Sequence, residues 1–225
     1  MNNQNPYRVV SIKPRRKHIA ALKLEPDIEK GEIKCETDEK GHLLLDLSLL
    51  EDGIISENML LDFEGIEALV NESYFRKAKS KALWHLSTGD HSKKGLLRKL
   101  MRCYPEAACI KAVERMCDLG YIDDEKFARN SCEVLSSRGL SNSAIISKLV
   151  SLGVASDLAK ECVRNAGNDQ IEQIDMIIKK RYINKLSDAK SIEKTIAALA
   201  RRGFSFSDIR AAIKKYTDTE FNEEC

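Results

Sequence analysis

The stretch Gly120-Tyr121-Ile122-Asp123-Asp124-Glu125-Lys126-Phe127-Ala128 decides how the middle of the chain folds. Its glycine follows an apolar, helix-periodic segment and ends it, because glycine readily takes the left-handed conformation at a helix C-terminus. Asp123 and Asp124 then place carboxylates where the free N–H groups and the positive dipole end of the next helix favour them. From Phe127 on, apolar residues recur at helical spacing. The stretch therefore predicts a joint between two helices.

Around this joint the chain repeats itself at intervals of 49 and 50 residues. Ser92, Ser141 and Ser191 fall in one column of the repeat, and a leucine follows each of them eight residues later. We predict that each copy is a helix whose N-cap is the serine and whose apolar columns face a core. The three columns are Leu100, Leu149 and Leu199; Leu97, Ile146 and Ile196; and Met101, Val150 and Ala200.

The second and third copies also end alike. Gly153 is followed by Ser156-Asp157, and Gly203 is followed by Ser207-Asp208. This pattern predicts that the glycine ends one helix and that the serine-aspartate pair begins the next. Helical periodicity is nearly continuous from residue 73 to 217. It divides into nine helices, at about 73–87, 92–103, 106–118, 123–137, 141–151, 156–166, 169–184, 188–202 and 207–216.

These motifs resemble those of the RecX family, regulators of the RecA recombinase. The resemblance rests on the joint at 120–128, on Ser92-x-x-x-Leu96-x-x-Lys99-Leu100, and on Leu199-Ala-Arg-Arg-Gly203-Phe204-x-x-x-x-Ile209. It covers roughly residues 73–215, and the joint is its most specific part. The family usually has a glycine after the first of these helices. This chain has Arg102-Cys103-Tyr104-Pro105 instead, where the proline can still end the helix.

The predicted fold is mainly α, with three tandem three-helix repeats in an elongated, curved array behind a small antiparallel β region. Stacking is expected because one three-helix unit buries its apolar faces poorly alone. Four short strands are predicted at 7–13, 19–24, 32–37 and 42–47, and an acidic helix from Ser56 to about Glu72. The predicted parts are the N-terminal β-rich region with this helix (1–72), repeats at 73–119, 120–167 and 168–217, and an acidic tail (218–225).

Charge is unevenly distributed along the 225 residues, although the net charge is only +2. Residues 8–23 carry six basic side chains and no acidic one, residues 25–72 carry a net charge of −12, and residues 73–119 carry +7. Such asymmetry points to charged partners rather than to a fold. No run of about 18 apolar residues occurs, so we predict neither secretion nor a membrane span, and a cytoplasmic location.

Enzymatic motifs are not apparent: there is no glycine-rich phosphate loop, no H-E-x-x-H and no G-x-S-x-G. The seven scattered cysteines form no C-x-x-C pair, which favours small packing residues in a reducing cytosol over a zinc site or a redox pair. Asp123 and Asp124 are interpreted as helix caps rather than a catalytic pair, and the four histidines as surface or packed residues. Trp84 is expected in a core or between domains. We predict no catalytic residue, metal or cofactor.

The remaining functional signal is basic. After Ser92, Lys94, Arg98 and Arg102 follow one another at i, i+4 and i+8, which predicts an exposed stripe opposite Leu97, Leu100 and Met101. A solvated helix face is the alternative for any single cation. The candidate residues for contact with a partner or DNA are Arg76, Lys77, Lys79, Lys81, Lys93, Lys94, Arg98, Lys99, Arg102, Lys179, Lys180, Arg181, Lys190, Lys194, Arg201, Arg202 and Arg210.

The RecX resemblance implies a non-enzymatic protein that binds RecA or the RecA–DNA filament and modulates its ATPase and strand exchange. We expect inhibition, although the sequence leaves stimulation open, and we expect a monomer. The alternative is a helix-turn-helix-type module that acts directly on single- or double-stranded DNA. The small net charge and the acidic segment at 25–72 make DNA binding a weak, salt-sensitive activity in this interpretation.

Overall fold

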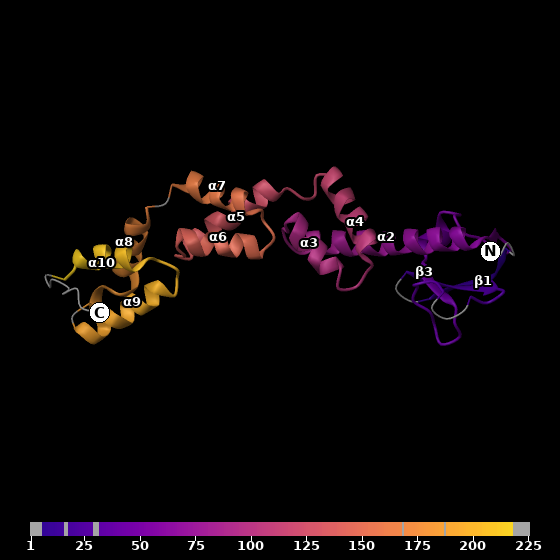
Figure 1. Ribbon diagram of the computed structural model, residues 1–225, viewed down its shortest axis with the longest axis horizontal. Helices are drawn as coiled ribbons and strands as arrows, with labels where there is room; N and C mark the ends of the chain where they lie inside the picture. The colour runs from indigo at the N-terminus through magenta and orange to yellow at the C-terminus, as the bar shows by residue number, and fades with distance from the viewer. Residues whose placement is uncertain (1–5, 16–17, 29–31, 168, 187, 218–225) are drawn as a thin grey trace. The chain divides into compact units, whose positions relative to one another are not determined.

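The computed structural model describes residues 6–15, 18–28, 32–167, 169–186 and 188–217. Ten α-helices and a small antiparallel sheet occur in these ranges, which confirms the predicted fold class (Figure 1). The predicted acidic tail at 218–225 lies outside the described residues. The chain forms two compact units, one of residues 1–89 and 96–121 and one of residues 90–95 and 122–225.

The first unit begins with a four-stranded antiparallel sheet in the order β3-β2-β1-β4. Alternating side chains of the strands point to one face, where Val9, Leu22 and Leu45 are almost fully buried. They share a core with the N-terminal half of α2. The bounds are β1 Tyr7–Arg15, β2 Ile19–Glu25, β3 Leu43–Asp46, α1 Ser48–Glu51, β4 Leu60–Leu61 and α2 Phe63–Thr88.

Two predictions for this region are wrong. Residues 32–37 form no strand; they contribute one isolated bridge, between Thr37 and Leu43. The acidic helix begins at Phe63 rather than at Ser56, because the Asp62 side chain accepts a hydrogen bond from the Gly65 N–H and caps it. The helix then continues without a break to Thr88. The switch from acidic to basic side chains near residue 72 is thus a change of surface charge inside one helix.

The C-terminal half of α2 packs against α4 (Glu106–Asp118). Small residues, Ala78 and Ala82, form the buried side of this half of α2, and neither is accessible to solvent. The chain leaves α4 at Gly120, which has φ +73°, and the Tyr121 N–H donates to the Met116 carbonyl at 2.9 Å. This is the glycine-ended helix C-terminus that the sequence predicts.

Asp123 and Asp124 cap two different helices of the second unit. Asp123 accepts a hydrogen bond from the Lys126 N–H at 2.9 Å and so begins α5 (Asp124–Ser137), as predicted. Asp124 accepts instead from the Lys93 N–H at 2.7 Å, at the first residue of α3 (Lys93–Leu100). The two adjacent carboxylates therefore each satisfy the N-terminal N–H groups of a different helix.

Two three-helix groups follow in the second unit, each around its own core. Ile145 and Leu149 are fully buried between α5 and its partners α6 and α7, and Leu199 and Ile209 between α8, α9 and α10. A 3₁₀ turn at Ile183–Lys185 follows α8. The helices are α6 Asn142–Ser151, α7 Ser156–Ala166, α8 Gln170–Arg181, α9 Ala189–Ala200 and α10 Phe206–Lys214.

The buried face of the repeated helix differs in part from the predicted one. The leucine column is fully buried, but Met101 and Val150 are 44% and 43% exposed. Their place is taken by the column four residues before the leucines, which is almost completely buried. This column consists of Leu96, Ile145 and Thr195. The face follows i and i+4 spacing closely, because those side chains lie directly above one another on a helix.

Caps are correctly predicted for two of the three copies. The Ser92 and Ser141 hydroxyls accept from the N–H groups three residues later and begin α3 and α6. The third prediction is wrong, since the N-cap of α9 is Asp188 and Ser191 lies in its first turn. The serine-aspartate pairs begin the next helices nearly as predicted: α7 starts at Ser156, and α10 starts at Phe206, one residue before Ser207.

Helix ends meet directly within the second unit. The Ser92 hydroxyl donates to the Leu152 carbonyl at 2.6 Å, so the N-terminus of α3 lies on the C-terminus of α6. Two glycines allow this approach. A Cβ atom on Gly95 would lie 2.7 Å from the Leu152 carbonyl oxygen, and one on Gly153 would lie 2.8 Å from the Gly95 nitrogen. The next pair of helices repeats the contact, with the Ser141 N–H donating to the Arg202 carbonyl at 3.0 Å.

A hydrogen-bonded group connects α8 to the end of α10. Asp175 accepts from the Tyr216 hydroxyl, and its other oxygen lies 2.7 Å from the Lys179 ammonium. The hydrogen bond from Lys179, together with that from Tyr216, lowers the pKa of the Asp175 carboxyl. The carboxylate form of Asp175 is therefore the one that the fold stabilises.

We expect Gly95→Ala to destabilise the protein, although alanine is ordinarily about 1 kcal/mol better than glycine inside a helix. The added methyl group would meet the Leu152 carbonyl oxygen at 2.7 Å. Relief of such overpacking typically costs about 1–3 kcal/mol. Urea unfolding followed by circular dichroism measures the change. Lys94→Ala, at an exposed position of the same helix, serves as the control. A gain in stability for Gly95→Ala would contradict the close approach of the two helix ends.

Asp175→Asn should reduce the free energy of unfolding at pH 7 and flatten its dependence on acid pH. Because the folded-state pKa is below the ordinary value of 3.8, the contribution is complete above that value. It is lost as the pH falls through the folded-state pKa. Urea titrations of both proteins between pH 7 and pH 2 measure the difference. Asp157→Asn is the matched control, since its ion-paired side chain is 99% exposed. Parallel pH profiles for Asp175→Asn and the unsubstituted protein would refute this role.

Candidate functional site

The cations of α3 face the solvent because the other side of this helix is buried. Leu96 and Leu100 are fully buried, and they hold α3 in one orientation. The cations on α3 and in the turn behind it are therefore exposed: Lys93, Lys94, Arg98, Lys99 and Arg102. The predicted opposite face was partly wrong, because Met101 is exposed and Leu96 takes its place.

Two of the α2 cations are engaged inside the first unit. Arg76 donates to Asp52 at 2.5 Å and to Glu72 at 3.0 Å, and the hydrogen bond to Asp52 raises the pKa of Arg76. Lys77 donates to the Leu44 carbonyl at 2.8 Å. Its side chain is only 12% exposed. These contacts attach α2 to the segments around the sheet, so both side chains have a structural role.

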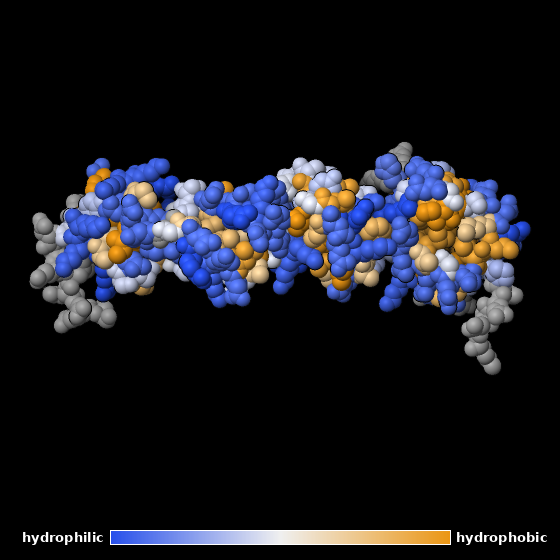
Figure 2. All heavy atoms as spheres, turned by 90° about the horizontal axis from the view of Figure 1, so that it is seen from above, coloured by the Kyte–Doolittle hydropathy of each residue, from blue (hydrophilic) through white to orange (hydrophobic). Residues whose placement is uncertain are grey.

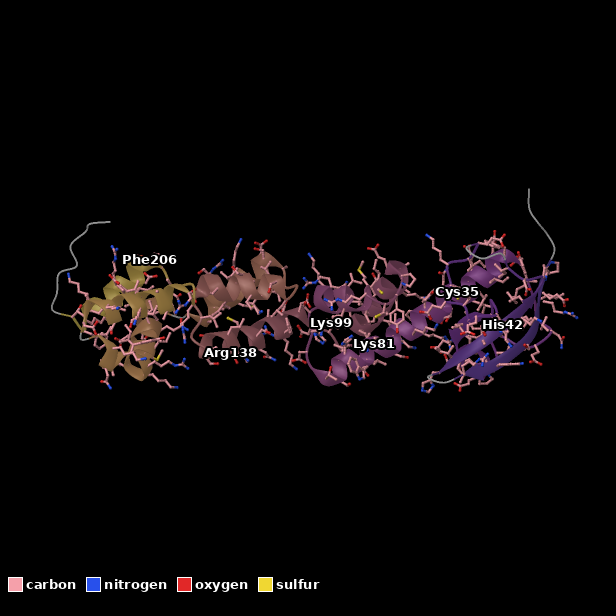
Figure 3. All side chains as sticks on the ribbon, turned by 90° about the horizontal axis from the view of Figure 1, so that it is seen from below. Cys35, His42, Lys81, Lys99, Arg138 and Phe206 are labelled. Atoms are coloured by element: carbon pink, nitrogen blue, oxygen red, sulfur yellow. The ribbon has the colours of Figure 1, made fainter. Side chains whose placement is uncertain are left out.

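The other two α2 cations lie on aromatic rings. The Lys79 ammonium is 5.7 Å from the centre of the Phe75 ring, and the Lys111 ammonium from α4 is 4.4 Å from it. The Lys81 ammonium lies 3.8 Å from the centre of the Trp84 ring; Lys81 is labelled in Figure 3. Trp84 is 53% exposed, so the prediction that it lies in a core is wrong.

In the second unit, the candidate cations differ in how far they are engaged by the protein itself. Lys179 is paired with Asp175, as described above. Arg202 donates to the carbonyls of Arg138 and Gly139 at 3.3 and 3.4 Å, at the negative dipole end of α5. The others have exposed side chains: Lys180, Arg181, Lys190, Lys194, Arg201 and Arg210.

One groove of the second unit brings several of these cations together. It has a volume of about 760 Å³, and Lys180, Arg181 and Arg202 line it together with Arg138. Arg138, labelled in Figure 3, was missed by the sequence analysis. Its signal is its place just before the glycine that ends α5, where a basic side chain is favoured. Glu133, Asp169 and Glu172 also line the groove, which is therefore of mixed charge.

Nucleophilic and metal-binding chemistry finds little support in the described residues. Burial raises the pKa of the Cys35, Cys109, Cys132 and Cys162 thiols and so disfavours the reactive thiolates. No group of three or more potential metal ligands occurs in the described part of the chain. Within the same residues, no helix has both the length and the apolar character to cross a bilayer.

The arrangement is thus one of dispersed charge on helix surfaces. In the view of Figure 2, hydrophilic side chains cover much of each unit, with smaller hydrophobic areas between them. Exposed apolar residues include Trp84 on α2 and Phe206 at the start of α10. Phe206 is labelled in Figure 3. Such surfaces bind macromolecules through many separate contacts rather than one small molecule in a deep pocket.

Known proteins with similar sequences are regulatory proteins. The model of the family domain described as "RecX, third three-helix domain" matches residues 168–213. The Regulatory protein RecX of Xanthomonas campestris pv. campestris (strain B100) is 34% identical over 137 residues, which are 60% of this chain and 84% of that protein. The Regulatory protein RecX of Herminiimonas arsenicoxydans is 27% identical over 143 residues, 63% of this chain and 94% of that protein.

Two solved structures have the same fold. A crystal structure of regulatory protein RecX aligns with a TM-score of 0.57 and 19% identity over 93% of this chain and 99% of that one. RecX from Lactobacillus salivarius aligns with a TM-score of 0.54 and 20% identity over 64% of this chain and 96% of that one. With the sequence relationship to the Xanthomonas protein, these findings show that the chain belongs to the RecX family of regulatory proteins.

Proposed function

We propose that this protein is a non-enzymatic, monomeric, cytoplasmic regulator that binds the RecA recombinase on DNA and lowers its ATP turnover and strand exchange. Membership of the RecX family, whose members are named regulatory proteins, carries the proposal. The binding surface would be the exposed cations of α3, α8 and α9. Three other candidate cations, Arg76, Lys77 and Lys179, would stabilise the fold instead of binding the partner. Acidic side chains or carbonyls of the chain already bind them.

Repetition supports a polymeric partner. We place the three helical units at residues 73–119, 120–167 and 168–217, after the N-terminal region at 1–72. Similar units can touch equivalent surfaces on successive subunits of a filament, so that modest single contacts add up to stable binding. The acidic segment at 25–72 and the basic segment at 73–119 would meet opposite charges on the filament and disfavour other partners.

A direct action on DNA is the second candidate, and the exposed cations on α3 favour it. A protein that depends on phosphate contacts alone is usually far more basic than one with a net charge of +2. We therefore propose DNA binding as an accompanying activity that weakens with salt.

Binding and ATPase measurements with RecA filaments test the main proposal. At physiological salt, the protein should bind RecA filaments on single-stranded DNA at least about tenfold more tightly than bare DNA. It should also lower their ATP hydrolysis at less than one copy per RecA subunit, because one molecule with several repeated units would contact several subunits. Anisotropy and a coupled ATPase assay measure the two effects. Equal affinity for bare DNA and filaments, or unchanged hydrolysis at saturation, would refute the proposal.

The α3 cations give a separate prediction. Replacing Lys94, Arg98 and Arg102 by glutamine should flatten the dependence of log K on log salt by about 0.7 for each single-strand phosphate that these side chains bind. The control variant replaces Lys126, Arg129 and Lys160, three exposed cations of α5 and α7, and changes the net charge equally. Titrations of labelled single-stranded DNA at several salt concentrations measure both slopes. An unchanged slope, or equal slopes for both variants, would assign the α3 cations to solvent.

A further inference from the structure

We infer that Trp84 of α2 is a stacking platform for one base of single-stranded DNA, with Lys81 as its phosphate-binding neighbour. The inference goes beyond RecA regulation, because it concerns bare DNA and a part of the protein outside the repeated α3, α6 and α9 helices. It arises from a side chain that the sequence places in a core and the structure places on the surface.

Exposure is the first observation. Trp84 is the single tryptophan of the chain, and 53% of it is accessible. The buried side of this half of α2 consists of Ala78 and Ala82, and Trp84 lies on the opposite side of the helix. An indole of this size loses much favourable burial by remaining in water, about 25 cal/mol for each Å² of apolar surface. An exposed indole offers a large flat apolar surface with a polar N–H, which is suited to contact with a partner.

The surroundings of the indole match the chemistry of nucleic acid. The Lys81 ammonium lies over the ring, 3.8 Å from its centre, while 53% of Trp84 is accessible to a partner. His85 contacts the ring edge, with centroids 4.9 Å apart in a T-shaped arrangement. No acidic residue occurs between Ser73 and Gly89. Proteins bind single-stranded nucleic acid by stacking bases on aromatic rings and by attracting phosphates to cations. An accessible ring with a cation beside it can provide both interactions.

Single-stranded DNA fits better than the other macromolecules with which such a surface could interact. A base in a duplex is already stacked on both faces and cannot reach the indole without unstacking, which costs a few kcal/mol. For a protein partner, the centre of a typical contact is poor in charge. Here the accessible ring stands directly against an ammonium group, which favours an anionic partner.

Fluorescence tests the inference directly, because all tryptophan emission comes from Trp84. Addition of oligodeoxythymidylate to the full chain at low salt should quench this emission saturably, since a stacked base contacts the indole. Inorganic polyphosphate carries the charge without bases and should leave the emission nearly unchanged. Quenching by polyphosphate to the same extent would mean attraction of an anion without stacking, and would overturn the inference.

Variants provide a second measurement that does not depend on tryptophan emission. In anisotropy titrations of labelled oligodeoxythymidylate, Trp84→Ala should weaken binding about five- to 150-fold, the range for removing one base–aromatic stack. Trp84→Phe should restore part of the affinity. Phe206→Ala removes another exposed aromatic side chain, 61% accessible on α10, and should leave the affinity unchanged. Lys81→Gln should reduce the salt slope by about 0.7, the value for one phosphate on a single strand.

Two results would reject the inference while the protein remains folded, as circular dichroism would establish. One is unchanged DNA affinity for Trp84→Ala. The other is a change of Trp84 emission that appears only with a RecA filament and never with bare DNA, which would assign the indole to a protein contact. Neither result contradicts RecA regulation, whose test is ATP hydrolysis. Failure of the two proposals can therefore be distinguished.

Discussion

The second unit depends on direct hydrogen bonding between the ends of the repeated helices, from α3 to α6 and from α6 to α9. An isolated helix leaves its first N–H groups and its last carbonyls without partners. Here the Ser92 hydroxyl accepts from the Gly95 N–H and donates to the Leu152 carbonyl, so that one oxygen atom satisfies groups of two helices. The positive dipole end of α3 thereby faces the negative end of α6, which adds a favourable electrostatic interaction. Glycines at 95 and 153 are required, because a methyl group at either would separate the ends.

Helix positions could be predicted from the sequence because the signals that end and begin these helices are local. Gly120 and Asp123 act through neighbours one to four residues away, and the structure uses both as expected. Failures occur where two local signals compete. Ser191 and Asp188 are both good N-caps, and the helix begins at the one that is met first. The failed strand at 32–37 has a different cause, because a strand requires a neighbour that no local pattern reveals.

Surface chemistry was less predictable, since the partner of a charged side chain is usually distant in sequence. Arg76 belongs to a run of cations, yet its carboxylate partner Asp52 lies before the helix, and only the fold brings the two together. Trp84 shows the converse. Hydrophobicity alone indicates burial, but the small residues Ala78 and Ala82 on the opposite side of α2 are the buried ones. Helical periodicity could have assigned Trp84 to the side of α2 opposite Ala78 and Ala82. It could not have predicted the contact of Trp84 with Lys81.

The choice between serine and aspartate at a helix start has a consequence for how two helix ends can be joined. A hydroxyl can accept from its own helix and still donate to another, whereas a carboxylate at neutral pH only accepts. Asp188 begins α9 where Ser92 and Ser141 begin α3 and α6. The Leu152 carbonyl accepts from the Ser92 hydroxyl, whereas the Arg202 carbonyl accepts from the Ser141 backbone N–H, so only the first of these two junctions requires a hydroxyl. An aspartate in place of Ser92 would still cap α3, but it would leave the Leu152 carbonyl without its donor.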